Sequence, residues 1–557
     1  MTVASIDSSH VMVTVKGLGS FAVVPGTVLG EFCATIQADW PHHIVAAIIC
    51  NTLRDLHYVL EKDTEIELVD TTMEAGLRIY RRSASFLLIK ACRDLFPERI
   101  LMIKHTLSNG LFCEFLNEES TDNEIEQILE RMRDMVKRDL PILRYLVSKD
   151  EAVRIFAGQG QQDKVKLLEY REKEAVHICE LDGFKEYFYG YMVYRTGVLD
   201  KFKLLYHSPG MVLRTPEIDD IDLLLPYREQ RKLAMIHREA KEWAEMLSTP
   251  HLAALNEIIA KGEIDDIIRV NEALHEKKIA YIADTICNNP NLRLVLISGP
   301  SSSGKTTFAQ RLLIQLRVNG LKPRTISLDN YFVDKSKTPR DSRGEYDFEA
   351  LEALKVDLFN DHLTRLIEGE EVELPLYNFR TGCCELQGRT MQVPPGEPII
   401  IEGIHGLNDK LTWKIPANSK FKIYVSALTQ LNLDYSNRIP TTDSRLIRRI
   451  IRDARVRGNS ALRTIQLWPS VRAGEERNIF PFQENADVMF NSSLVYELCA
   501  LRPYVEPLLE DISWEDPEHV DARRLLRFIS YFRAIPSINI PPNSIVREFV
   551  GGGWFDV

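Results

Sequence analysis

The pattern of hydrophobic and polar positions changes three times along the chain of 557 residues. From 11 to 70, short apolar runs alternate with glycine and proline, which predicts a small β-rich module. From about 77 to 225, helical and strand patterns mix. From 226 to 290, apolar residues recur three and four positions apart, which predicts a helical linking segment. A fourth region follows and begins with a different pattern.

This fourth region opens with a strand, a loop and a helix. The apolar run 292–297 suits a buried parallel strand and ends at a glycine. The segment GPSSSGKT that follows fits G-x-x-x-x-G-K-[ST], whose backbone N–H groups surround a phosphate. The alternative is a plain glycine-serine turn, but the strand and helix around it favour a nucleotide triphosphate site. The residues expected to bind nucleotide are Gly299, Ser301, Ser302, Ser303, Gly304, Lys305, Thr306 and Thr307.

Side chains with catalytic chemistry lie in this loop and after two later strands. Lys305 is expected to reach the β and γ oxygens, and the Thr306 hydroxyl to bind Mg²⁺. The strand patterns RTISLDNYF and EPIIIEGIHG lead to Asp329 and Glu402. Ligands of open α/β sheets lie beyond the carboxyl ends of the strands. We therefore expect Glu402 to hold Mg²⁺, directly or through water, and Asp329 to act as the base. The alternative for each acid is a helix cap or a surface position.

The segment SRLIRRIIRDARVRG predicts an amphipathic helix with a cationic side. Arginines beside a transferring phosphoryl group stabilise its charge, whereas the alternative is a solvated basic face. The arginines at three- and four-residue steps are Arg445, Arg448, Arg452 and Arg455.

Composition narrows the class of protein. The net charge of −11, with 45% hydrophobic and 27% charged residues, is that of a globular protein with no general affinity for nucleic acid. The first residues do not have the pattern of a secretory signal, and no apolar run is long enough to span a membrane. We expect a cytoplasmic protein without membrane contact. Nine cysteines without a CxxC pair predict reduced thiols, and self-association stays open.

Residues 291 to about 500 resemble the uridine kinase and phosphoribulokinase family. The motifs that carry the resemblance are GPSSSGKTTF, SLDNYF, YDFEALE, LPLYNF, IIIEGIHGL and RRIIRDARVRG. The resemblance implies an α/β P-loop kinase, with a parallel sheet flanked by helices, that uses ATP and Mg²⁺ to phosphorylate a nucleoside hydroxyl. It also implies a role for each of several residues: Asp329 as catalytic base, Asp347 on the ribose, Tyr377 and Phe379 beside the base, and Arg449, Arg452 and Arg457 in the lid. For the aromatic pair, packing inside a hairpin core remains the alternative.

The front half is similar to the amino-terminal part of threonyl-tRNA synthetase. Residues 1–72 resemble its TGS module, and 73–225 resemble the editing-type domain that follows. At the metal-ligand positions of that domain this sequence has Arg82, Phe86, Phe188 and Met192, so we expect no catalytic metal there. RNA contact, regulation and scaffolding stay open for this half. Nucleoside kinases of bacterial type that contain a TGS module are similar to most of the chain, including the segment IPPNSIVREFVGG.

The sequence therefore predicts four parts: 1–72, 73–225, a helical linker 226–290, and a kinase domain 291–557. The predicted function is ATP-dependent phosphorylation of a nucleoside 5′-hydroxyl. Uridine is the leading acceptor, but Gly382 and Asn459 stand where the pyrimidine kinases carry a histidine and an arginine, which favours a shift towards purines. The rivals are a kinase of another hydroxyl acceptor, such as a sugar phosphate, and an RNA-binding regulatory ATPase.

Overall fold

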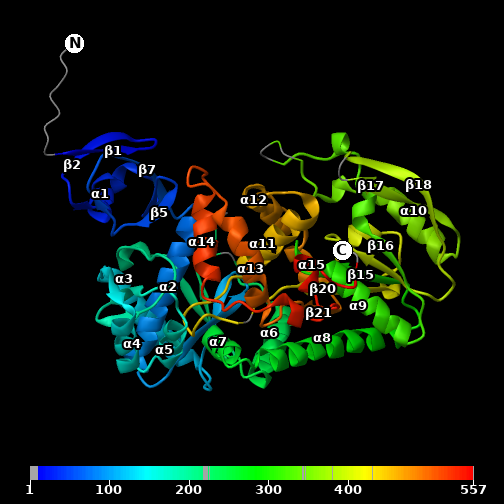
Figure 1. Ribbon diagram of the computed structural model, residues 1–557, viewed down its shortest axis with the longest axis horizontal. Coiled ribbons are helices and arrows are strands. Elements are labelled where there is room, and N and C mark those ends of the chain that lie inside the picture. Colours follow the sequence, from blue (N-terminus) through cyan, green and yellow to red (C-terminus); the bar gives the residue numbers. More distant parts are fainter. Residues whose placement is uncertain are drawn as a thin grey trace, which may run out of the picture.

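Two sets of domains lie side by side, joined by helices beneath both (Figure 1). The computed structural model describes residues 10–217, 224, 226–341, 344, 346–378, 381–429 and 431–555. Phe379, expected beside the acceptor base, lies outside the described residues.

The amino-terminal module is a five-stranded mixed sheet in the order β2-β1-β7-β4-β5, with one helix against it. In β1, every second residue is buried, as expected of a strand with one face on the core. The elements are β1 (Val11–Val15), β2 (Gly19–Val23), β3 (Thr27–Val28), α1 (Leu29–Ile36), β4 (Ile44–Ile49), β5 (Thr52–Asp55), β6 (Val59–Leu60) and β7 (Thr64–Asp70).

The second domain is α+β, with antiparallel sheets in the orders β13-β14-β9-β8 and β10-β11-β12. Helix α3 begins with a capping box, in which Thr121 and Glu124 satisfy each other's backbone N–H groups. The elements are α2 (Glu74–Leu95), β8 (Leu101–Leu107), β9 (Gly110–Phe115), α3 (Asp122–Lys137), β10 (Ile142–Ser148), α4 (Lys149–Gly158), α5 (Gln162–Glu169), β11 (Ala175–Leu181), β12 (Phe184–Glu186), β13 (Lys203–His207) and β14 (Gly210–Arg214).

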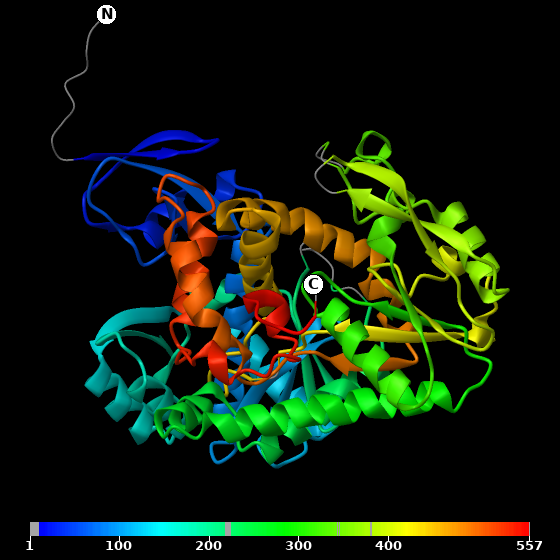
Figure 2. The same ribbon diagram turned by 45° about the vertical axis from the view of Figure 1, so that its right-hand side comes forward.

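Three helices connect the front domains to the remainder: α6 (Arg231–Met246), α7 (Leu252–Ala260) and α8 (Ile264–Cys287). Helix α8 runs along the lower edge of the molecule in both views (Figures 1 and 2). It packs on α9 (Lys305–Val318), where the buried Arg311 pairs with Glu272 (3.4 Å) and Glu276 (2.8 Å).

The third unit is built on a five-stranded sheet in the order β16-β19-β15-β20-β21, in which all pairs are parallel. The predicted α/β class with a parallel sheet and flanking helices is confirmed. Its strands are β15 (Leu294–Ser298), β16 (Arg324–Ser327), β19 (Ile399–Glu402), β20 (Lys420–Ser426) and β21 (Val488–Asn491), with a separate hairpin of β17 (Val372–Asn378) and β18 (Cys383–Met391). Its helices after α9 are α10 (Val356–Ile367), α11 (Thr441–Arg452), α12 (Ala461–Asn478), α13 (Glu497–Glu510), α14 (His519–Ile529) and α15 (Arg547–Val550).

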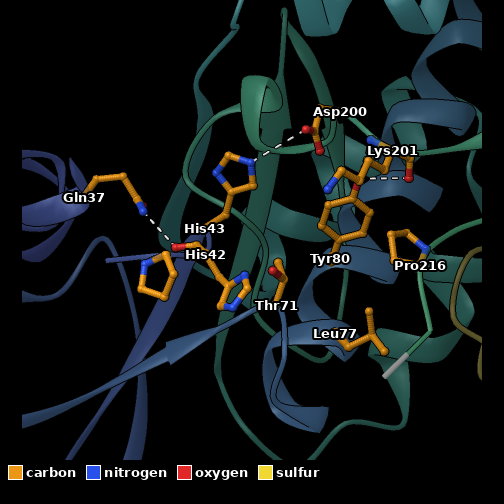
Figure 3. Close-up of a pocket in the computed structure, with 10 residues that line it drawn as sticks. Gln37, His42, His43, Thr71, Leu77, Tyr80, Asp200, Lys201 and Pro216 are labelled. Carbon is orange, nitrogen blue, oxygen red and sulfur yellow. Dashed lines mark hydrogen bonds and ion pairs between the residues drawn. The ribbon is translucent and has the colours of Figure 1, made fainter. Parts of the chain in front are cut away.

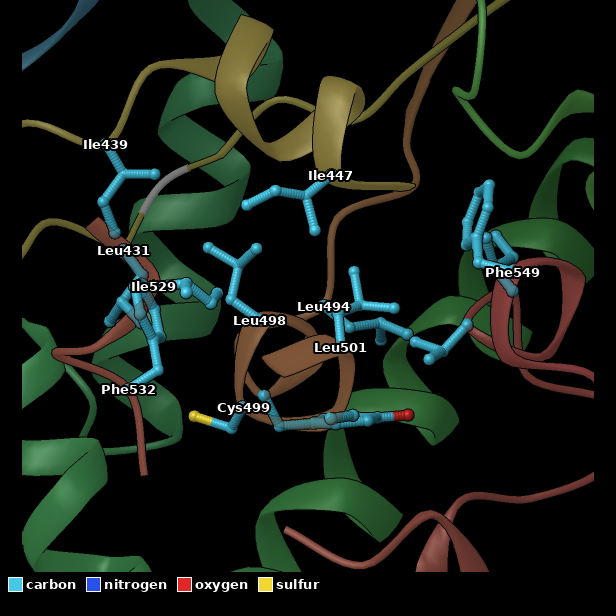
Figure 4. Close-up of a cluster of buried hydrophobic side chains, with 14 of the residues drawn as sticks. Leu431, Ile439, Ile447, Leu494, Leu498, Cys499, Leu501, Ile529, Phe532 and Phe549 are labelled. Atoms are coloured by element: carbon cyan, nitrogen blue, oxygen red, sulfur yellow. The ribbon is translucent and has the colours of Figure 1, made fainter. Parts of the chain in front are cut away.

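The main core of this unit lies between α11, α13 and the segments that follow α13. Ile447 of α11 and Leu498 of α13 face each other, and Phe549 of α15 closes one end of the layer (Figure 4). All three side chains are buried in one hydrophobic cluster. The tail residues after α14 are therefore part of the core of the unit.

The front domains and the third unit interlock at two places. Beside α14, Asn51 donates to the carbonyl of Glu515 at 2.8 Å, and the rings of Tyr189 and Phe528 lie 6.3 Å apart. The loop between β20 and α11 enters the second domain, where Asn432 donates to a backbone carbonyl of β8.

A buried charged cluster joins that loop to the second domain. Lys164, which is 2% exposed, pairs with Glu186 at 2.9 Å and lies 3.8 Å from Asp434. Among the described residues, no helix combines the length and the apolar composition needed to cross a membrane.

Candidate active site

The phosphate loop lies between β15, which ends at Ser298, and α9, which begins at Lys305. Gly304 has φ +81° and Ser302 has φ +57°, so the loop has two left-handed residues. Glycine adopts this conformation without strain, which explains the second glycine of the motif. A Cβ at Gly304 would also lie 2.6 Å from Cγ2 of Ile545, so there is no room for a side chain.

Lys305 lies against the backbone of its own loop. Its Nζ donates to the carbonyl oxygens of Gly299 (2.9 Å) and Pro300 (3.0 Å). Burial lowers the pKa of this ammonium, and the carboxylates of Glu402 and Glu548 oppose the shift. The cation is thus held at the loop and surrounded by acids, where a phosphate group can be neutralised.

The hydroxyl side chains of the loop and of the first turn of α9 differ in their burial and in their hydrogen bonding. Those of Ser302 and Ser303 are buried and have no hydrogen-bond partner among the described residues. Buried polar groups are normally paired, so both fit a loop that closes on a ligand. Thr306 and Thr307 lie in the first turn of α9; Thr306 is half-buried and Thr307 is buried.

Glu402 lies at the carboxyl edge of the sheet, as predicted. The parallel register places it beside Ile297 of β15 and Ser327 of β16, and the Ser327 hydroxyl donates to Glu402 Oε1 at 3.0 Å. Burial raises the pKa of Glu402 to about 7, and the charge of Asp329 raises it further. Asp329 follows β16 by two residues, in a short 3-10 helix. Burial raises its pKa, while Lys305 opposes the shift.

Glu349 is a further acid of this site, and the sequence analysis missed it. Burial raises its pKa to about 7, and Glu475 raises it as well, while Arg449 and Lys305 oppose the shift. Glu349 is part of the motif YDFEALE and comes two residues after Asp347, but the sequence pattern does not indicate which acid of the motif faces the loop. The structure therefore brings Lys305 together with three acids that come from distant motifs.

Two arginines of α11 brace the phosphate loop. Arg445 Nε donates to the carbonyl of Ser301 at 2.9 Å, and its guanidinium pairs with Glu475. Arg448 pairs with Glu497. Both arginines are buried, 1% and 0% exposed, because the loop, α12 and α13 cover this side of the helix. The solvated basic face considered from the sequence therefore does not hold for Arg445 and Arg448.

The three arginines expected in the lid gather around the fully buried Asp453. Arg452 lies 2.9 Å from its carboxylate, Arg449 3.2 Å and Arg457 3.6 Å. Arg449 Nη1 also donates to the hydroxyl of Ser301 at 2.7 Å. The cluster is therefore attached to the phosphate loop through Ser301.

The two described residues that were expected to contact the acceptor, Asp347 and Tyr377, have different environments. Asp347 accepts a hydrogen bond from Arg477 Nη2 at 2.9 Å. Tyr377 is buried in β17, where its ring packs edge-on against Phe332 with centroids 5.4 Å apart. The packing of Tyr377 agrees with the hairpin core that the sequence left as the alternative, and its role beside the acceptor base stays a prediction.

In the second domain, the positions that correspond to metal ligands converge as a packed core. The rings of Phe86 and Phe188 lie edge to face with centroids 5.3 Å apart, and Met192 is 2% exposed in the same cluster. Arg82 donates from Nη1 to the carbonyl of Tyr191 at 2.8 Å. Aromatic rings and a guanidinium thus fill the place where the resemblance puts a metal.

Two cavities lie at domain junctions away from the phosphate loop. One of about 190 Å³ lies between the amino-terminal module and the second domain, with His43, Tyr80 and Asp200 on its walls (Figure 3). The other, of about 360 Å³, lies beside the buried charged cluster and is lined by Lys164 and Glu186.

A sequence model of the phosphoribulokinase / uridine kinase family matches residues 294–497. Over this range, which is less than half of the chain, the sequence is similar to that family. The match covers the phosphate loop, the three acids and the arginine helix of the site described above. The similarity supports a P-loop phosphotransferase domain in this part of the chain.

Outside the kinase domain, the amino-terminal region is similar to threonine–tRNA ligases. The enzyme of Coxiella burnetii is 33% identical over 162 residues, 29% of this chain and 25% of the relative. That of Marinobacter nauticus is 30% identical over 185 residues, 31% of this chain and 28% of the relative. The chain thus spans about a quarter of the length of these curated relatives.

Among solved structures, the chain is similar to one described as a possible uridine kinase from Bacillus stearothermophilus. The two are 21% identical, with a TM-score of 0.27, over 39% of this chain and 98% of that one. A D-glycerate 3-kinase from Cryptococcus neoformans is 14% identical, with a TM-score of 0.21, over 48% of this chain and 90% of that one.

Proposed function

We propose that the protein is an ATP- and Mg²⁺-dependent kinase that phosphorylates the 5′-hydroxyl of a nucleoside. The observation that carries the proposal is the meeting of Lys305, Asp329, Arg452 and Arg457 in one site, where the three cations act on the Asp329 carboxyl. Water attack on a nucleotide would not need an acceptor site built around Asp347. This favours a kinase over the RNA-binding ATPase.

The residues at the loop fit ATP and Mg²⁺. Backbone N–H groups at the start of α9 and the Lys305 ammonium suit the phosphates. Mg²⁺ prefers hard oxygen ligands, and Thr306 and Glu402 offer a hydroxyl and a carboxylate. Burial, and then the charge of Asp329, raise the pKa of Glu402 although Lys305 opposes the shift, and a divalent cation would stabilise the charged carboxylate further. When bound, the ion neutralises phosphate charge.

The chemical step follows from the positions of the acids and arginines. Asp329 orients the acceptor hydroxyl and takes its proton as the new O–P bond forms and the bond from the γ-phosphorus to the bridging oxygen breaks. Arg449, Arg452 and Arg457 stabilise the negative charge that spreads over the transferred group. Most of the rate comes from positioning and charge neutralisation, because little covalent chemistry is required of the protein.

The turn at Gly382 supports an altered choice of base. Gly382 has φ +71°, donates from its N–H to the carbonyl of Asn378 at 2.7 Å, and would place a Cβ 2.8 Å from Cβ of Lys335. A side chain is disfavoured there by both the conformation and the neighbour, so no histidine reaches a base edge from this turn. We infer that a purine is accepted more readily than by the pyrimidine kinases, with uridine still the first acceptor to test.

The test uses the purified full chain with ATP, Mg²⁺ and separate acceptors, scored by the mass of the products. We expect 5′-phosphorylated nucleosides, and kcat/KM for uridine, cytidine, adenosine, guanosine and inosine ranks the bases. Phosphorylated sugar phosphates with no nucleotide product would favour the sugar kinase. ATP hydrolysis that RNA stimulates, without any phosphorylated acceptor, would favour the ATPase. A preference for both pyrimidines of more than about 100-fold over every purine would reject the altered base choice.

A further inference from the structure

The segment after α14 folds back over the phosphate loop. Helix α15 lies next to α11 and close to α9 in both views (Figures 1 and 2). Ile545, Val546 and Phe549 of this segment are 0%, 1% and 1% exposed, and they belong to the main core. The segment is therefore fixed in place by burial of its apolar side chains.

One acidic side chain of this segment reaches the loop itself. Glu548 Oε2 accepts hydrogen bonds from the hydroxyl of Thr307 at 2.8 Å and from its backbone N–H at 3.3 Å. The Glu548 side chain is buried, 6% exposed. The amino terminus of a helix attracts anions, and in this motif its N–H groups cradle the nucleotide phosphates. The carboxylate thus holds donors that a phosphate would use.

Of the other anion-binding groups of the loop, the N–H of Ser301 donates to Glu475 at 2.9 Å, whereas the serine hydroxyls and Lys305 are not bonded to an acid among the described residues. The hydroxyls of Ser302 and Ser303 have no partner among the described residues, and Lys305 donates to carbonyls of the loop. These groups show that the cradle is built for a larger anion than one carboxylate. Glu548 occupies only part of it.

The backbone of Glu548 is held in place by an arginine that follows α11. Arg455 donates to the carbonyl oxygens of Glu548 (2.8 Å) and Phe549 (3.1 Å), and the guanidinium of Arg448 lies 4.9 Å from the centroid of the Phe549 ring. Release of the whole segment would expose its buried apolar side chains. Among the described residues, rotation of the Glu548 side chain alone breaks its two bonds to Thr307 and no other, so it is the smaller change.

We propose that Glu548 is an internal occupant of the phosphate loop that a nucleotide must displace, so that this residue sets nucleotide affinity. The inference rests on the proposed function, in which the loop binds ATP. The carboxylate competes for the donors of Thr307 and places a negative charge near Lys305, whose neighbours already include Glu402. Both effects oppose the arrival of an anionic nucleotide.

The test is calorimetric titration of the full chain with Mg²⁺-ADP, Mg²⁺-ATP and tripolyphosphate. Glu548→Gln keeps the size of the side chain and removes its charge, and Glu548→Ala is a second variant that removes its reach. We expect both to bind ADP about tenfold more tightly than the wild type, equivalent to about 1.4 kcal/mol. Glu515→Gln, an equal charge change on an exposed residue beside Asn51, should leave the affinity unchanged.

The outcomes separate this inference from the kinase proposal. Equal or weaker ADP binding by both Glu548 variants, with normal binding by the wild type, overturns the inference and leaves the kinase intact. If the wild type binds neither adenine nucleotide, the kinase proposal fails, and tripolyphosphate then decides the inference. Tighter tripolyphosphate binding by the variants still supports displacement of Glu548 by an incoming anion. Equal tripolyphosphate affinity of the variants and the wild type overturns the inference.

Discussion

Removal of the negative charge of Glu475 should destabilise the kinase domain through the phosphate loop. The Glu475 side chain is 0% exposed and its Oε1 pairs with Arg445, which is 1% exposed. The same oxygen accepts a hydrogen bond from the N–H of Ser301 at 2.9 Å. Glu475→Gln keeps the size of the side chain and one acceptor oxygen. It leaves Arg445 as a buried cation without its countercharge.

The expected size follows from this loss of charge pairing. Removing one partner of a buried ion pair costs about 3–5 kcal/mol. We expect the lower end, about 3 kcal/mol, because the glutamine oxygen still accepts a hydrogen bond and Arg445 keeps its bond to the Ser301 carbonyl. With a urea m-value of about 3 kcal/mol/M, the unfolding midpoint of the domain should fall by about 1 M.

A neighbour in α12 provides the matched control. Glu476→Gln removes the same charge one residue later; Glu476 pairs with Arg472 at 2.6 Å but is 56% exposed, so the cost should be at most about 1 kcal/mol. Hydrogen exchange of residues 294–313 in increasing urea follows the loop itself, because a chain of several domains need not unfold in one transition. Equal midpoints for the two variants would refute the role of Glu475 as a brace.

Three further predictions follow from the site and the domain junctions. Asp329→Asn should lower phosphoryl transfer by about 10²-fold or more while calorimetry shows ADP binding close to that of the wild type; full activity would exclude it as the base. Lys164→Met should lower the stability by about 3–5 kcal/mol, seen in thermal unfolding, because Glu186 and Asp434 lose their buried countercharge. An unchanged melting temperature would show that this cluster contributes little. Metal analysis of the full chain should find no stoichiometric zinc, since Arg82 and Phe86 offer no lone pair, and one zinc per chain held by residues 73–225 would contradict this.

Local pattern was sufficient for the strand, loop and helix of the phosphate site. The apolar run predicted over 292–297 is β15, Leu294–Ser298, and α9 begins at the lysine of the motif. Both follow from short-range physics, because a buried parallel strand needs a continuous apolar run and a phosphate loop needs glycine at fixed spacing. The acids at strand ends follow from the general geometry of parallel sheets.

The rest depends on contacts between distant segments, which no periodicity encodes. Glu548 meets Thr307 across 241 positions of sequence, and Glu475 meets Ser301 across 174. The amphipathic pattern of α11 predicted an apolar face and a cationic face, but not which segments pack on each. Its cationic face is partly buried because Glu475 and Glu497 neutralise Arg445 and Arg448 there.

The interlock beside α14 has a consequence for synthesis of the chain. The surface of the front domains that includes Asn51 and Tyr189 is covered by residues 514–528, which are made much later. At 5–20 residues per second, the roughly 300 residues between the end of β14 and the start of α14 take about 15–60 s to synthesise. During that interval the finished front domains present an uncovered face to the cell, a target for chaperones and a hazard for aggregation.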